Sequence, residues 1–103
     1  MKSIIETLPA SRCYLCGAYG ALEKHHIFGG NPNRKWSEKY GLTVHLCPYC
    51  HRDNKHGVHS DPTVADHLHK IGQRAFEKNY SREEFYHVFG RYYLEEGEEG
   101  GRS

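Results

Sequence analysis

Long apolar runs are missing from this chain of 103 residues. No segment approaches the roughly 18 consecutive apolar residues that a membrane-spanning helix needs, and residues 1–10 lack the apolar stretch and cleavage context of a signal peptide. We therefore expect a cytoplasmic protein without a membrane partner. Only 37% of the residues are apolar and the mean hydropathy is −0.84, so the chain can form one domain with a small core. A bound metal ion would compensate for that small core.

A strong excess of one charge is also missing, because the net charge is only +1. Residues 95–103 hold four Glu and one Arg, which leaves 13 basic and 9 acidic residues in residues 1–94. The modest positive charge of residues 1–94 is compatible with nucleic-acid binding and equally with an ordinary solvated surface. We expect residues 95–103 to be a disordered acidic tail. Residues 1–12, in which Pro9 stops any helix, are predicted to be a flexible lead to a domain at 13–94.

The first half of the domain has the pattern of two strands. We expect strands at residues 21–28 and 42–46. The Gly- and Asn-rich segment 29–33 forces a loop between them, and residues 34–40 are predicted to form a helical turn that Gly41 ends.

The second half of the domain has the pattern of helices. A short helix is expected at residues 49–54. The next helix has Ser60 or Asp61 as its N-cap and an apolar face at helical spacing. Ser81 and Glu84 form a capping box that begins the last helix. These elements predict an α+β fold with two C-terminal helices.

Two C-x-x-C pairs supply four soft metal ligands. The cytoplasm keeps thiols reduced, so we interpret the cysteines as metal thiolates rather than as disulfides. A structural zinc ion is the expected occupant of a site formed by Cys13, Cys16, Cys47 and Cys50. Two alternatives remain open: a thioredoxin-like redox pair, and a mixed site in which His51 or His45 replaces one thiolate.

Four histidines could converge on a second site: His25, His26, His51 and His59. Neighbouring residues of a strand point to opposite faces, so His25 and His26 are expected to have different roles. A neutral imidazole can accept a proton from water near pH 7, and a divalent ion can neutralise charge that develops on a phosphate. This pattern predicts metal-assisted phosphodiester hydrolysis.

Residues 23–28, with the sequence EKHHIF, and residues 46–51, with the sequence LCPYCH, resemble the HNH endonuclease superfamily, also called the His-Me finger or ββα-metal group. More narrowly, residues 25–59 resemble small phage and prophage HNH-type proteins of Gram-positive bacteria. The resemblance implies a zinc-stapled ββα-metal core followed by the two C-terminal helices. It also implies a DNA endonuclease, in a bacterial or phage-infected cell, that leaves a 5′-phosphate by a one-metal mechanism.

The same resemblance implies roles for individual residues. His25 and His51 would be ligands of a catalytic Mg²⁺, Mn²⁺ or similar ion, and His26 would be the general base. The last ligand is expected to be His59, with His56 as the alternative. The residue that orients the base is expected to be Asn33, with Asn31 or His45 as alternatives.

Basic residues follow the histidine pair in the loop and the helical turn. Arg34, Lys35 and Lys39 surround Trp36 and could contact a phosphate backbone, while Trp36 either stacks on nucleic acid or closes the core. The expected partners are DNA and a phage protein. A homodimer would suit double-strand cleavage, because one metal site cuts one strand. A non-catalytic zinc module that binds DNA or a protein is the alternative function.

Overall fold

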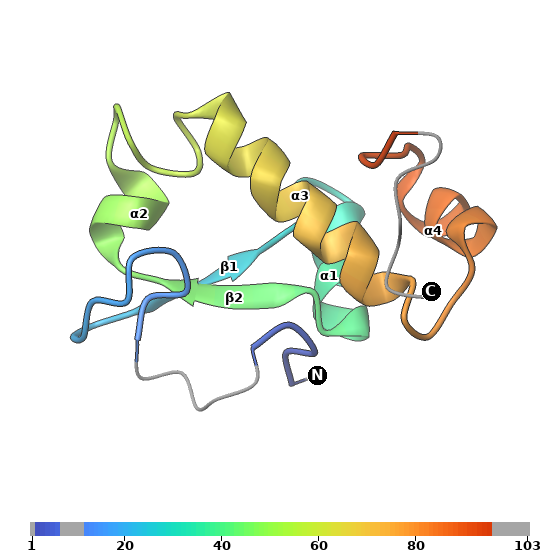
Figure 1. Ribbon diagram of the computed structural model, residues 1–103, viewed down its shortest axis with the longest axis horizontal. Helices are drawn as coiled ribbons and strands as arrows, with labels where there is room; N and C mark the ends of the chain where they lie inside the picture. The colour runs from blue at the N-terminus through green and yellow to red at the C-terminus, as the bar shows by residue number, and fades with distance from the viewer. Residues whose placement is uncertain (1, 7–11, 96–103) are drawn as a thin grey trace.

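A two-stranded sheet with helices around it makes up the fold. The computed structural model describes residues 2–6 and 12–95. Strand β1 (Glu23–His26) pairs with β2 (Thr43–Leu46) in antiparallel register, so that His25 lies opposite Val44. The helices are α1 (Asn33–Tyr40), α2 (Pro48–Arg52), α3 (Pro62–Phe76) and α4 (Arg82–Phe89). In Figure 1, α3 crosses in front of the sheet, with α2 near one of its ends and α4 near the other.

These elements confirm the predicted α+β class, with local differences. The strands are shorter than predicted, with four residues each, and the expected helical turn is an eight-residue helix that begins at Asn33. Gly41 ends this helix in a left-handed conformation, with φ of 72°, which a glycine adopts without strain. Asp61 is the N-cap of α3 through Thr63, and the capping box of Ser81 is present at the start of α4.

An aromatic and aliphatic core fills the space between the sheet, α3 and α4. Its largest fully buried side chains include Phe28, Phe76, Phe85, Leu42 and Leu68. The ring centroids of Phe28 and Phe85 lie 5.4 Å apart in an edge-to-face arrangement, which favours both rings beyond their burial. The segment after β1 is therefore held firmly, and with it the histidines of that strand.

Gly72 allows α3 to approach this segment closely. A Cβ atom at Gly72 would lie 2.7 Å from Ile27 Cγ2 and 2.8 Å from Phe28 Cε2, closer than packed atoms can lie. Helix α3 therefore rests directly on the residues that follow His26, and its N-terminal half is brought beside β1.

The start of the chain packs against the sheet. Ser3 Oγ donates a hydrogen bond to the Thr43 carbonyl at 2.6 Å, and Ile4 N donates to the Gly41 carbonyl at 2.9 Å. Glu6 accepts hydrogen bonds from His45. Residues 2–6 thus make specific contacts where the sequence suggested a flexible lead. Residues 7–11 and 96–103 of the predicted lead and tail lie outside the described residues.

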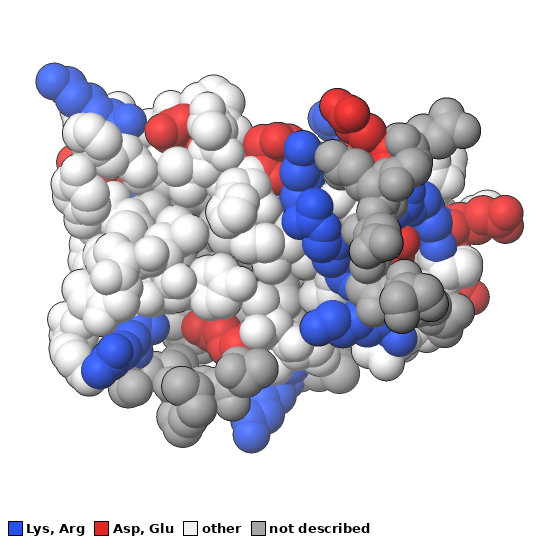
Figure 2. Space-filling view, viewed as in Figure 1, with Lys and Arg blue, Asp and Glu red and all other residues white. Residues whose placement is uncertain are grey.

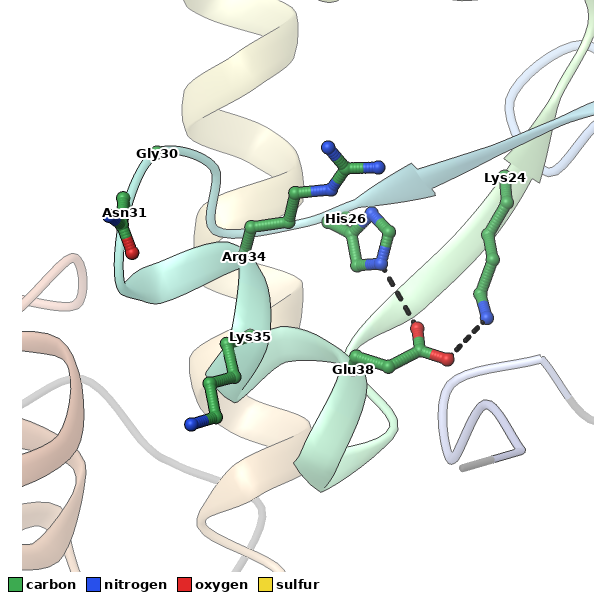
Figure 3. Close-up of a pocket in the computed structure, with 7 residues that line it drawn as sticks. All are labelled: Lys24, His26, Gly30, Asn31, Arg34, Lys35 and Glu38. Carbon is green, nitrogen blue, oxygen red and sulfur yellow. Dashed lines mark hydrogen bonds and ion pairs between the residues drawn. The ribbon is translucent and has the colours of Figure 1, made fainter.

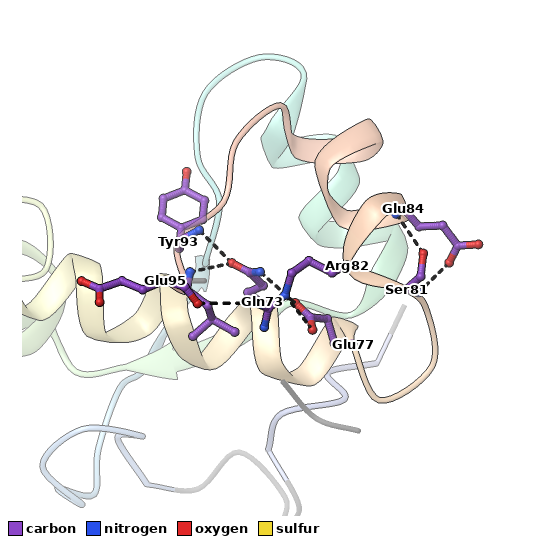
Figure 4. A network of polar contacts seen from close by, with 8 residues as sticks. Gln73, Glu77, Ser81, Arg82, Glu84, Tyr93 and Glu95 are labelled. Atoms are coloured by element: carbon purple, nitrogen blue, oxygen red, sulfur yellow. Dashed lines mark hydrogen bonds and ion pairs between the residues drawn. The ribbon is translucent and has the colours of Figure 1, made fainter. Parts of the chain in front are cut away.

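A buried polar network connects α3 to the segment after α4 (Figure 4). Gln73 is fully buried, and its Oε1 accepts hydrogen bonds from the backbone N–H groups of Tyr93 and Leu94 at 2.7 and 2.9 Å. Its Nε2 donates to Glu77, which also pairs with Arg82. These bonds fix the chain after α4 against the core, because an unpaired amide there would be costly. Among the described residues no helix has the length and apolar character to cross a membrane.

Candidate metal centres and catalytic site

The four cysteines lie together and form what we call the cysteine cluster: Cys13, Cys16, Cys47 and Cys50. Their sulfur atoms all lie within 4.8 Å of one another, and all four are free thiols. Cys16 Sγ and Cys47 Sγ are 3.7 Å apart. Tetrahedral bonds of about 2.3 Å to one zinc ion would separate the sulfurs by about 3.8 Å. The cluster can therefore bind a metal ion.

Backbone hydrogen bonds set this geometry. The first pair lies in a tight turn in which Gly17 N donates to the Cys13 carbonyl at 2.9 Å. Tyr14 N donates to the His45 carbonyl, which ties that turn to β2. Cys47 is the N-cap of α2, and Cys50 follows within that helix. The strand pair therefore brings together two turns that are about 30 residues apart in sequence.

The thiols of the cysteine cluster differ in how readily they ionise. Burial raises the pKa of Cys13, but hydrogen bonds from the backbone N–H groups of Cys16, Cys47 and Leu15 outweigh it and lower the value to about 6. Burial and the neighbouring cysteines raise the pKa of Cys50. One thiol thus ionises readily while another resists, so four thiolates together need a positive ion among them.

Neither histidine of the predicted mixed site joins the cysteine cluster. His45 Nδ1 lies 2.9 Å from Glu6 Oε1, and His51 belongs to a separate group of histidines. The two C-x-x-C pairs face each other rather than lying in a βαβ unit, and the described strands are antiparallel. This arrangement favours metal binding over the redox alternative.

Three histidines from different elements form the second group, the histidine cluster: His25 of β1, His51 of α2 and His59 of the turn before α3. Their nearest ring nitrogens all lie within 4.8 Å of one another. The Nε2 atoms of His51 and His59 are 3.0 Å apart, and the His25 ring centroid lies 5.2 Å from each of the other two. The structure thus brings together the three residues predicted to be ligands of a catalytic ion.

A carboxylate orients one of these ligands. Glu23 Oε1 lies 2.9 Å from His51 Nδ1, and Glu23 also pairs with Arg52 at 2.7 Å. The hydrogen bond from His51 lowers the pKa of Glu23, so the carboxylate is ionised and accepts the Nδ1 proton. The His51 lone pair is then on Nε2, the atom that faces His59. Carboxylates commonly hold metal-ligating histidines in this way.

Two histidines of the cluster, His25 and His59, disfavour protons. Burial, followed by the nearby His51 and His59, lowers the pKa of His25 to about 3. Burial and His51 also lower the pKa of His59. Neutral imidazoles with converging lone pairs are the protonation state that a divalent ion requires.

Of the two candidates for the last ligand, His59 lies in the histidine cluster and His56 does not. His56 Nδ1 lies 3.2 Å from Asp53 Oδ2, and its ring stacks on Tyr49 at 5.5 Å. The chain turns back at Gly57. A Cβ atom at this position would lie 2.6 Å from Asp53 N, so the close turn needs a glycine. His59 therefore enters the cluster and His56 lies outside it, as we expected.

His26 is the last residue of β1, and its ring contacts a carboxylate of α1. Its Nε2 lies 3.0 Å from Glu38 Oε2, while Glu38 Oε1 lies 2.7 Å from Lys24 Nζ (Figure 3). The hydrogen bond from Lys24 is the main reason that the pKa of Glu38 falls to about 2. An ionised Glu38 accepts the Nε2 proton, which leaves Nδ1 of His26 as the basic atom.

A small cavity connects His26 to the histidine cluster. This histidine cavity has a volume of about 270 Å³ and is lined by His25, His26, Ile27, Gly29, Val58, His59, Ala65 and His69. His69, which was not among the residues predicted for the site, lines this cavity and stacks on Phe28 at 5.5 Å. Its spacing from Ala65 and Gly72, on one face of α3, was the signal in the sequence. The cavity holds a candidate base and two candidate ligands within one small volume.

The structure does not bring Asn33 to His26. Asn33 Nδ2 donates to the Phe89 carbonyl at 3.4 Å and so connects α1 to α4. His45 is bonded to Glu6, and Glu38 takes the position expected for an asparagine. Glu38 was not among the residues predicted for the site, although it lies within the segment 25–59 that carries the narrower resemblance.

The basic residues divide between two environments. Arg34 and Lys35 line an open groove of about 680 Å³, the α1 groove, together with Lys24, His26, Gly30, Asn31 and Glu38 (Figure 3). Lys35 Nζ and Lys39 Nζ also lie over the Trp36 ring, at 5.5 and 5.4 Å, and Lys39 Nζ lies 5.6 Å from the centre of the Tyr40 ring. Trp36 is half-buried and packs against the core, which favours its structural role.

The face of the molecule that carries α3 has a mixed charge. Figure 2 shows basic side chains gathered towards the C-terminal half of α3 and α4, with acidic side chains among them. In the opposite half of this view the middle is uncharged, and charged side chains lie towards its upper and lower edges. On this face acidic side chains lie beside the basic ones, whereas the α1 groove places Arg34 and Lys35 beside His26. The α1 groove is therefore the better candidate for a phosphate contact.

Comparisons with known proteins add no relative to this picture. No protein-family model matches the chain, and no curated protein or solved structure matches it significantly.

Proposed function

We propose that this protein is a metal-dependent DNA endonuclease of the HNH type. The observation that carries the proposal is the histidine cavity, where His26, oriented by Glu38, opens on the same space as His25 and His59 of the histidine cluster. A base and a divalent-ion site beside one another are the minimal equipment for phosphodiester hydrolysis. The resemblance of residues 23–28 and 46–51 to HNH endonucleases supports the same conclusion.

Each residue has a defined part in this proposal. His26 accepts a proton from the attacking water at Nδ1, because Glu38 occupies its Nε2. His25, His51 and His59 hold the divalent ion, with Glu23 keeping His51 in the required tautomer. When bound, the ion supplies positive charge that stabilises the phosphate and the departing 3′ oxygen. The product would carry a 5′-phosphate.

The donor atoms bear on which ion is used. Three imidazole nitrogens suit borderline ions such as Zn²⁺, Ni²⁺ and Co²⁺, and they also accept Mn²⁺. Mg²⁺ prefers oxygen ligands and keeps its water shell. We therefore expect activity to be greater with Mn²⁺ or Ni²⁺ than with Mg²⁺, although Mg²⁺ was an equal candidate from the sequence.

The cysteine cluster has a different part in the proposal. Four thiolates with no open position are the donor set of a structural zinc site. Zinc bound there would hold the turn of Cys13 and Cys16 against α2, and α2 carries His51. The structural ion would thereby position a ligand of the catalytic one.

Nicking of supercoiled plasmid tests the proposal. Wild-type protein is incubated with Mg²⁺, Mn²⁺, Ni²⁺ or no added ion, beside His26→Ala and the matched control His87→Ala, which changes an exposed histidine of α4. Loss of a general base typically costs about 10²- to 10⁴-fold in rate. We expect divalent-dependent nicking by wild type and His87→Ala, and its loss in His26→Ala with the zinc content unchanged.

A non-catalytic module is the second candidate, and one observation favours it. Asn33, expected to orient the base, is bonded to Phe89 and does not reach His26. Absence of nicking with every ion, or equal nicking by wild type and His26→Ala, would support a zinc module that binds DNA or a protein partner.

A further inference from the structure

The α1 groove includes His26 but none of the three residues of the histidine cluster. We propose that it is a phosphate subsite, which holds the DNA phosphate next to the one that is cut. The inference rests on the proposed nuclease function and names the substrate more closely. It requires a strand with at least two phosphates rather than an isolated phosphodiester.

The position of His26 is the first support. His26 lines both the histidine cavity and the α1 groove. Phosphates follow one another along a DNA strand with a rise of about 3.4 Å per nucleotide. A strand whose scissile phosphate lies beside His26 in the cavity therefore continues past the imidazole, and the groove is the hollow on that side.

Charge is the second support. Lys24, Arg34 and Lys35 contribute three cations to the groove, against the single carboxylate of Glu38. That carboxylate is already engaged by Lys24 and His26. Among residues 2–6 and 12–95 no carboxylate pairs with Arg34 or Lys35. Lys35 Nζ lies over the Trp36 ring at 5.5 Å, so Arg34 is the cation best placed to attract an anion.

Side-chain geometry identifies Arg34 as the main contact. Figure 3 shows its guanidinium extending from α1 towards the His26 ring, while Lys35 points to another side of the helix. A guanidinium offers paired N–H donors that match two oxygens of one phosphate. The backbone N–H groups of Arg34 and Lys35 already donate to the carbonyls of Gly30 and Pro32. Side chains must therefore hold the anion.

Direct binding tests the subsite without any need for cleavage. Zinc-loaded, ¹⁵N-labelled full-length protein is titrated with thymidine 3′,5′-bisphosphate, without further divalent ions, and followed by NMR. We expect shifts at the amides of Gly30 and Asn31 and about tenfold weaker binding by Arg34→Gln, as for loss of a charge-assisted hydrogen bond. The control Lys78→Gln, which removes an exposed positive charge outside the groove, should bind like wild type. Shifts elsewhere, or equal affinities of Arg34→Gln and wild type, would overturn the subsite.

Cleavage separates this inference from the proposed function. Wild type and Arg34→Gln are compared on a short DNA duplex and on bis(p-nitrophenyl) phosphate, which has one phosphate. We expect Arg34→Gln to lower kcat/KM for the duplex about tenfold more than for the small diester, and to reduce the salt dependence of duplex binding by about one phosphate contact. Equal losses on both substrates would contradict a flanking subsite. Failure of wild type to cut either substrate would contradict the nuclease function, and the NMR titration would still decide the subsite.

Discussion

The two candidate metal-binding clusters lie near each other yet differ in what surrounds their donor atoms. The cysteine cluster has four thiols at the distances of a tetrahedral site, so an ion there would have its coordination completed by the protein. The histidine cluster has three imidazoles and borders a cavity of about 270 Å³ that also contains His26. An ion there would keep positions for water and phosphate. A closed donor set suits a structural site, and an open one suits chemistry.

Helix α2 couples these two clusters. It carries Cys50 and His51 as neighbours, and Cys47 is its N-cap. Consecutive residues of a helix point about 100° apart, so one short helix can serve two sites. A metal ion bound to the cysteine cluster would therefore set the orientation of α2, which presents His51 to Glu23 and His59. We infer that damage to the cysteine cluster affects both sites, whereas damage to the histidine cluster stays local.

The largest expected effect is on folding. Cys47→Ser removes a zinc ligand, and structural zinc sites contribute about 10–16 kcal/mol of binding energy to small domains. We expect this variant to lose cooperative thermal unfolding, measured by circular dichroism, together with zinc. His51→Ala should keep both, because it lies outside the cysteine cluster. Unfolding of both variants alike would show that the clusters are not separable.

The next effect concerns divalent-ion affinity at the histidine cluster. Glu23→Gln weakens the hydrogen bond that orients His51, and loss of such partners typically costs about 10- to 100-fold in metal affinity. Isothermal titration with Ni²⁺ on zinc-loaded protein would measure it. Arg52→Gln removes only the exposed partner of Glu23 and should have a much smaller effect. Equal losses in the two variants would instead assign the effect to the ion pair.

The smallest predicted effect is on stability against pH, with only the cysteine cluster loaded. The pKa of His25 is about 3 in the folded state and near 6.5 when unfolded, so the unfolded chain binds more protons between these values. The contribution of neutral, buried His25 to the free energy of unfolding is complete above pH 6.5 and is lost as pH falls towards 3. Between pH 7 and 5 we expect wild type to lose about 1–2 kcal/mol more than His25→Gln in urea unfolding. If the free energies of unfolding of wild type and His25→Gln changed with pH in parallel, the lowered pKa of His25 would be contradicted.

Much of the fold was predictable because its signals are local. Helix caps at Asp61 and Ser81, the glycine at position 41 and the two C-x-x-C pairs all act over a few residues, and each is present in the structure. The histidine cluster was predictable through the resemblance, since the spacing of His25, His51 and His59 alone does not bring them together.

The residues that sequence reasoning missed depend on contacts between distant segments. Glu38 reaches His26 only because α1 folds back over β1, and Asn33 bonds Phe89 across 56 positions of sequence. His69 faces the cavity because Gly72 lets α3 approach Ile27. Residues 2–6 contact β2 through the Ser3 hydroxyl and the Glu6 carboxylate, and Ile4 N donates to the Gly41 carbonyl. These contacts join segments about 40 positions apart in sequence, so no local pattern reveals them.

Metal content is the most direct test of two separable sites with different tasks. Wild type, His59→Ala and the control His56→Ala would be dialysed against equal Zn²⁺ and analysed by mass spectrometry for metal per chain. His56 has a similar place in the turn and lies outside the histidine cluster. We predict two ions in wild type and His56→Ala, and one in His59→Ala. One ion in all three proteins would contradict the account, because the histidine cluster would then bind no metal.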